Sequence, residues 1–108
     1  MARGIYVFRG AVSANGNVVQ PAADERIYLR WITASVGTLN ASGRLALTDG
    51  NGGPVIARLP MATADASIQL FYDAGARQWE GNPLSPGTAL YATITGGSAD
   101  LEIAYEIR

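Results

Sequence analysis

Side chains that could do chemistry are few in this chain, which has no histidine, no cysteine and no lysine. Its charged groups are nine carboxylates and eight arginines, spread over 108 residues. The cysteine nucleophile and the histidine and lysine acid–base groups are therefore missing. The lack of cysteine also means neither a disulfide framework nor a cysteine zinc site. We expect no enzyme, no cofactor and no metal site.

The arrangement nearest to a catalytic pair is Asp73 and Glu80, which flank Trp79. Two carboxylates can hydrolyse a glycosidic bond when a suitable distance separates them. Nine acids in so short a chain also form pairs by chance, so we assign no catalytic residue.

The loop at 49–53, Asp-Gly-Asn-Gly-Gly, partly resembles a calcium loop. An EF-hand needs an oxygen ligand where Gly53 stands and a glutamate where Pro60 stands. The glycines could also cradle a phosphate, but the β-branched pair at 55–56 follows where a helix is required. Since Gly and Asn tolerate tight turns, this loop predicts a hairpin turn.

The formal net charge of −1 argues against nucleic-acid binding, because such domains carry a basic patch. Arg9 interrupts the first apolar run well short of a signal-peptide core, and no run approaches the ~20 apolar residues of a membrane span. We expect a protein made in the cytoplasm, with neither a membrane nor a nucleic-acid partner.

Alternation of apolar and polar residues is the dominant pattern, and it predicts β-strands. Residues 88–95 and 101–108 alternate most clearly and flank a Gly-Gly-Ser-Ala-Asp turn, which predicts a closing hairpin. A second predicted hairpin joins 43–48 to 55–59. The dipeptide Asn15-Gly16 predicts a third one near the N-terminus.

Residues 26–36 are apolar on both faces, with Ile27, Leu29 and Trp31 predicted to share one of them. Such a strand is central, or it changes sheets at a bulge. A further strand is expected at 67–73, and 60–65 is expected to be a loop. About seven to nine short antiparallel strands in a single domain, 1–108, predict a two-sheet β-sandwich or jelly roll.

Candidate interface residues come from two segments. Edge strands invite pairing with other chains, and this chain lacks the lysines that commonly guard them. Residues 1–12 are therefore expected as an N-terminal arm or an edge strand, and they contribute Tyr6, Phe8 and Arg9. The Gly/Pro-rich loop at 73–87 contributes Arg77 and Trp79, residue types enriched at interface hot spots. Trp79 could equally anchor its own loop. A homo-oligomer, dimer or trimer, is expected.

The segment 87–97 followed by 101–107 resembles the closing hairpin of small all-β accessory virion proteins of tailed bacteriophages, of the capsid decoration or cement type. The resemblance implies a place in the virion, on the outer surface of the head. There the protein would stabilise capsomer contacts non-covalently by binding the major capsid protein or another virion protein. No position-specific motif matches, so the resemblance assigns no site residue.

Two alternatives remain open. One is another phage structural module, from the tail, the collar or a fibre attachment. The other is a small carbohydrate-binding β-sandwich that would use Trp79 and Tyr72, because aromatic rings can stack on sugars.

Overall fold

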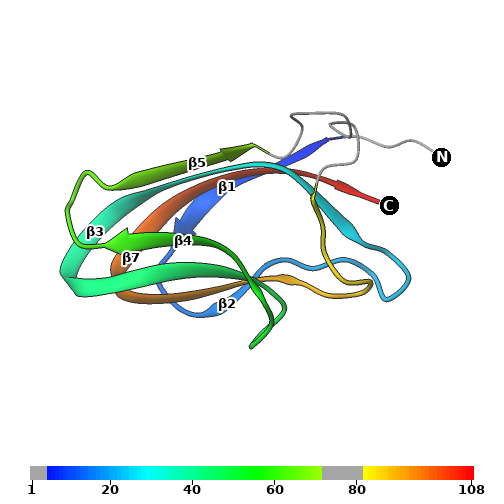
Figure 1. Cartoon of the computed structure of the whole chain (residues 1–108), viewed down its shortest axis with the longest axis horizontal. Coiled ribbons are helices and arrows are strands. Elements are labelled where there is room, and N and C mark those ends of the chain that lie inside the picture. The colour runs from blue at the N-terminus through cyan, green and yellow to red at the C-terminus, as the bar shows by residue number, and fades with distance from the viewer. Residues whose placement is uncertain (1–4, 72–81) are drawn as a thin grey trace.

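The computed structural model describes residues 5–71 and 82–108, and every regular element in them is a β-strand. All pairings between strands are antiparallel (Figure 1). The strands are β1 (Tyr6–Val12), β2 (Gly16–Val19), β3 (Ile27–Asp49), β4 (Val55–Met61), β5 (Ser67–Phe71), β6 (Asn82–Pro83) and β7 (Leu90–Ile107). The all-β prediction is confirmed.

Two long strands form the centre of the molecule. β3 and β7 pair from Ile27 opposite Ile107 to Asp49 opposite Leu90, and they bend together half-way (Figure 1). At the bend the register shifts, from Leu39 opposite Gly97 to Arg44 opposite Thr95. Each long strand therefore contributes one half to each of two facing sheets.

The edge strands follow the same bend but are interrupted there. Sheet one has the order β1, the second half of β7, the first half of β3, and β5, and the two-residue β6 pairs with β3 on the same side as β5. Sheet two has the order β2, the first half of β7, the second half of β3, and β4. Eight strand segments in this order make a jelly roll, in which two four-stranded sheets enclose one core.

The predicted closing hairpin is wrong, because β7 is one continuous strand whose halves do not pair with each other. Gly96 and Gly97 have positive φ angles of 94° and 149°, which bend the strand. A Cβ on Gly97 would lie 1.8 Å from the carbonyl oxygen of Thr38. The glycine pair that predicted a turn therefore makes the corner between the sheets.

The hairpin predicted at Asn15-Gly16 is also wrong, because β1 and β2 each pair with β7 and not with each other. The Asn15 side-chain oxygen accepts a hydrogen bond from the Ile94 backbone N–H at 2.9 Å. This contact fastens the interrupted edge to β7 at the corner. The hairpin between 43–48 and 55–59 is confirmed by the β3–β4 pairing.

A register shift between Leu29 and Trp31 changes which residues of β3 point inward. Ile27 and Leu29 are fully buried, and Ile32 continues the buried row, whereas Trp31 is only half-buried. The predicted face shared with Trp31 is therefore wrong, because the bulge adds one residue to the strand. Of the two predictions for 26–36, the central strand is confirmed, because this part of β3 lies between β7 and β5; the change of sheets comes later, between Leu39 and Arg44.

Two smaller differences concern the ends of strands. Pro60 was expected in a loop, but it lies within β4 opposite Arg44. The strand expected at 67–73 is present as Ser67–Phe71, and its predicted end lies outside the described residues.

The core fills the space between the sheets. Its largest fully buried side chains come mainly from β3, β4 and β7: Ile27, Leu29, Ile32, Leu45, Leu47, Leu59, Met61, Leu90 and Ile103. Among the described residues, no helix is long and apolar enough to cross a membrane.

Candidate interface on strand β1

β1 is an edge strand of sheet one. It pairs with β7 from Tyr6 opposite Tyr105 to Val12 opposite Ala99. Its other side pairs with none of the described residues. Of the two expectations for 1–12, arm or edge strand, the described part is an edge strand.

The apolar side chains of this edge are unusually exposed. Ile5, which directly precedes β1, is 59% exposed, Tyr6 is 52% and Val7 is 42%. In the described residues, the other large hydrophobic residue that is exposed is Val55, at 45%. Three of these four residues are therefore consecutive in the chain and lie at one edge.

Tyr6 and Phe8 lie on the face of β1 that points toward the other sheet. The ring of Tyr6 stacks on Tyr105, with centroids 5.6 Å apart. Phe8 packs against the core and lies over Gly10, where a Cβ would be 3.1 Å from the ring. Burial, and secondarily the charge of Tyr6, raise the pKa of Tyr105 above its ordinary value. Tyr6 is thus the exposed member of a group of three aromatic residues, and the other two, Phe8 and Tyr105, pack against the core.

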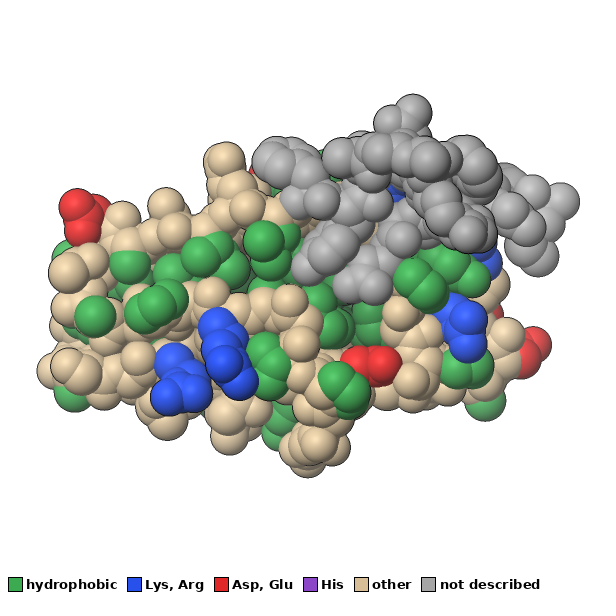
Figure 2. All heavy atoms as spheres, in the orientation of Figure 1, with side chains coloured by type: hydrophobic (Ala, Val, Ile, Leu, Met, Phe, Trp, Pro, Cys, Tyr) green, Lys and Arg blue, Asp and Glu red, His purple; other side chains and the backbone are tan. Residues whose placement is uncertain are grey.

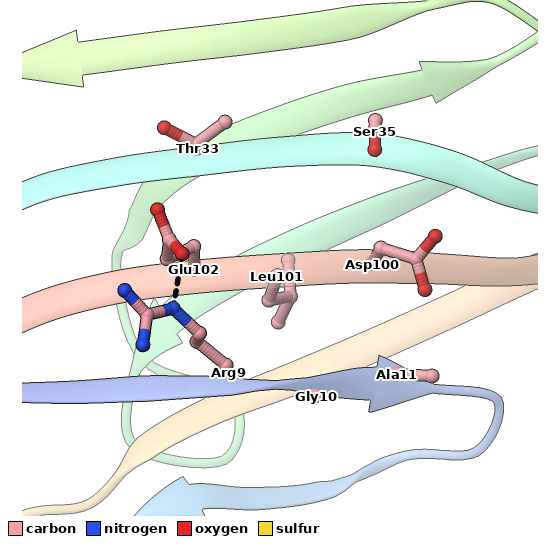
Figure 3. A pocket seen from close by; sticks show the side chains of 8 residues that line it. All are labelled: Arg9, Gly10, Ala11, Thr33, Ser35, Asp100, Leu101 and Glu102. Atoms are coloured by element: carbon pink, nitrogen blue, oxygen red, sulfur yellow. Dashed lines mark hydrogen bonds and ion pairs between the residues drawn. The ribbon is translucent and has the colours of Figure 1, made fainter.

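Arg9 lies on the opposite face, which is the outer face of sheet one. It forms an ion pair with Glu102 on the neighbouring strand (Figure 3). The side chain of Arg9 is 71% exposed and that of Glu102 is 38% exposed, so water screens this pair. The pair nevertheless neutralises the one charged side chain of β1.

Three cross-strand rows cover this outer face, and their character changes along the strands. The first is apolar, with Val7, Ala104 and Trp31 side by side. The second holds the ion pair and then Thr33, and the third holds Ala11, Asp100 and Ser35. An open groove of about 440 Å³ runs over the second and third rows (Figure 3). The exposed edge therefore borders a groove with charged and hydroxyl side chains at one end and apolar residues at the other.

The other edges of the two sheets are protected. β4 carries exposed Arg58 and Pro60, and proline has no N–H to offer a new strand. β2 has four residues and β5 has five, and short strands present few free backbone groups. β1 has seven residues without proline, lysine or an acid. It is the edge best suited to pairing with another strand.

A second surface lies on the open side of the sandwich, between β4 and β5. Hydrophobic side chains gather along this side of the molecule, with basic side chains below them (Figure 2). An open groove there is lined by Val55, Ile56, Ala57, Arg58, Ile68 and Leu70. On the outer face of sheet two, exposed Arg44 lies diagonally opposite Arg58, and neither forms an ion pair with the described residues.

Near the C-terminus of β7, sheet one carries a mostly buried ionic cluster. Glu106 accepts hydrogen bonds from Arg30 Nη1 at 2.9 Å and from Arg108 Nη2 at 3.2 Å. The guanidinium of Arg108 also lies 4.2 Å from the centre of the Tyr28 ring. Each charge has an opposite partner, so the cluster has the features of a structural element of the sheet.

The described residues contain no cluster of three side chains that could hold a metal ion. In the loop at 49–53, the Asp49 carboxylate accepts hydrogen bonds from the backbone N–H and the hydroxyl of Ser85. This contact fastens the β3–β4 turn to the segment before β7. Asp100 and Glu102 share the groove, but Glu102 is engaged by Arg9.

The structure brings the predicted interface residues Tyr6, Phe8 and Arg9 together on one strand, with Tyr6 and Arg9 exposed and Phe8 half-buried. The candidates of the second segment, Arg77 and Trp79, lie outside the described residues, as do Tyr72, Asp73 and Glu80. Sequence reasoning did not identify Ile5 and Val7. The signal was the unbroken apolar run at 5–8, which gives an edge strand two apolar faces.

No known family model matches the sequence, and no curated protein matches it.

Proposed function

We propose that this protein is a structural binding module, not an enzyme, and that it acts through the β1 edge and the adjoining outer face of sheet one. The exposed run from Ile5 to Val7 on an unprotected strand carries this proposal. An edge strand of this kind offers backbone hydrogen bonds for affinity and alternate side chains for specificity.

More specifically, we propose a capsid decoration protein of a tailed phage, which binds the outer head surface and stabilises capsomer contacts without covalent bonds. The jelly-roll order of strands supports this, since viral capsid proteins use that architecture, although lectins use it as well. Most of the segment 87–97, which prompted the resemblance, belongs to the bent strand β7, which begins at Leu90. The proposal therefore depends on the fold and the exposed edge. The partner would be the major capsid protein or another virion protein.

The test is rebinding to expanded phage heads that lack the protein. The wild-type chain should co-sediment with such heads and raise their melting temperature. Val7→Lys, which places a charge on the β1 edge, should reduce binding at least tenfold. The matched control Val55→Lys charges an equally exposed valine on β4 and should bind like the wild type. If the wild-type chain binds no head, the decoration role is wrong.

The two alternatives separate by location and by ligand. A tail, collar or fibre module would be found by immunogold labelling away from the head. A carbohydrate-binding module would give a signal on a glycan array. No aromatic side chain lines the groove of Figure 3, so no described observation favours sugar binding there.

A further inference from the structure

We infer that the partner of the β1 edge is β1 of a second copy of this chain, paired antiparallel across a two-fold axis centred near Val7. This inference rests on the proposed function, because it takes β1 as a contact surface, and it divides that surface between two partners. The β1 edge joins two copies of the chain, and the adjoining outer face of sheet one remains for the phage head. The product would be a dimer in which the two copies of sheet one form one continuous eight-stranded sheet.

The backbone of β1 supplies the first argument. Its free side presents unpaired N–H and C=O groups over seven residues, and these groups are satisfied when another strand lies beside them. An antiparallel copy related by a two-fold axis keeps the two faces of the strand in phase, because residues on one face meet residues on the same face. A second copy therefore matches the alternation of β1 without any adjustment.

The side chains favour one register of this pairing. Centred on Val7, it places Tyr6 opposite Phe8 of the partner subunit twice, which gives two aromatic cross-strand pairs. It also places Val7 opposite its own counterpart. Ile5 then covers the stem of the arginine at position 9 in the other copy. The three most exposed apolar residues of the edge are covered together.

Charge excludes the register that would give the longest overlap. Centring the pair on Arg9, the middle of β1, would put two arginines directly opposite each other, which is unfavourable. In the register centred on Val7, each Arg9 faces an isoleucine and keeps its ion pair with Glu102. The protected β4 edge offers no comparable solution, because Pro60 and Arg58 interrupt it.

The test is the mass of the purified wild-type chain in sedimentation equilibrium over a wide concentration range. A strand edge is smaller than the ~1,600 Å² of a standard interface, so the dimer should dissociate on dilution. The mass should rise from the 11.3 kDa of one chain toward twice that value. Val7→Lys should remain a monomer at least tenfold above the wild-type midpoint, whereas Val55→Lys should behave like the wild type. A wild-type monomer at every concentration, or a dimer that Val7→Lys leaves intact, overturns the inference.

Single cysteines provide a second test that does not depend on a disruptive substitution. The native chain has no cysteine, so each added thiol reports only its own position. Under mild oxidation Val7→Cys should form a cross-linked dimer much faster than Arg9→Cys or Val55→Cys, because only position 7 faces itself. Faster cross-linking of Arg9→Cys, or equal rates for all three, contradicts the proposed register.

The results separate this inference from the proposed function. A wild-type monomer that binds phage heads overturns the dimer and leaves the decoration role standing. A dimer that binds no head overturns the decoration role and leaves the dimer standing.

Discussion

The two sheets of this jelly roll are built on the same central strands but end differently. Sheet one ends in β1, with exposed apolar residues, no proline and one arginine whose charge is paired with Glu102. Sheet two ends in β4, where Pro60 and Arg58 protect the edge. The outer faces differ as well, because the charges of Arg9 and Arg30 are paired on sheet one. On sheet two, Arg44 and Arg58 have no ion pair within the described residues.

This difference shows that edge protection is local and not a property of the whole chain. A chain without lysine still protects β4 with a proline and with an arginine that has no ion pair in the described residues, whereas β1 has no proline and its one arginine is paired with Glu102. The opposite treatment of the two edges is what makes β1 a candidate contact surface.

The largest expected effect comes from breaking the corner that joins the sheets. Gly97→Ala should cost on the order of 4 kcal/mol of unfolding free energy, because its Cβ would overlap the Thr38 carbonyl and φ is +149°. Because both sheets continue through this corner, the loss of stability should affect the β1 edge and the β4 edge together. Urea denaturation measures the loss. Gly16→Ala, where a Cβ meets nothing within 4 Å, is the control and should change stability by less than about 0.5 kcal/mol.

The next largest effect on stability should distinguish the outer face of sheet one from that of sheet two. Glu106→Gln should cost about 3 kcal/mol, because it removes the carboxylate charge that pairs with the mostly buried Arg30 and Arg108. The control on sheet two, Arg44→Gln, removes an exposed charge and should stay within about 0.5 kcal/mol of the wild type. Equal losses in the two variants would show that the sheets do not differ in this way.

The general architecture could be predicted because it follows from the alternation of side chains. Leu101 and Ile103 point into the core as the period of two requires, and the β3–β4 hairpin forms where Gly and Asn allow a tight turn. These features depend on residues near one another in the sequence.

The corner could not be predicted in the same way. A Gly-Gly pair supplies positive φ angles equally well for a hairpin turn and for a bend in one strand. The choice depends on β3, which lies more than fifty residues earlier and bends beside β7. The bulge before Trp31 has a similar cause, since register is set by the partner strand.

The candidate site was predictable in part. That Tyr6, Phe8 and Arg9 lie on one strand follows from local sequence. The exposure of Ile5 and Val7 does not follow from local sequence. These residues are exposed because none of the described strands lies beyond β1. Only the topology shows which apolar run is left uncovered.

A smaller effect should appear at alkaline pH and concern sheet one. The pKa of Tyr105 is raised from 10.0 in the folded chain, mainly by burial and then by Tyr6. Its contribution to stability is complete below pH 10 and is lost as the pH rises through the folded-state value. Tyr105→Phe should therefore flatten the loss of stability above pH 10, measured by urea denaturation.

The matched control for the alkaline effect is Tyr91→Phe, a tyrosine on the outer face of sheet two. This variant keeps Tyr105 and should lose stability above pH 10 as the wild type does. If both variants flatten the curve equally, the effect does not belong to the β1 side of the molecule.

The smallest effect on stability should come from Glu102→Gln, which breaks the ion pair beside the edge. The Arg9 side chain is 71% exposed, so the loss should be about 0.5 kcal/mol or less and should shrink with added salt. Self-association should be affected more than folding. Without the Glu102 carboxylate, the Arg9 charge of one copy is no longer neutralised, and the two arginines repel each other across the two-fold axis. At low salt the dimer should weaken severalfold in sedimentation equilibrium, and salt should restore it. A large loss of stability with unchanged association would instead assign the Arg9–Glu102 pair to the fold of sheet one and not to its edge.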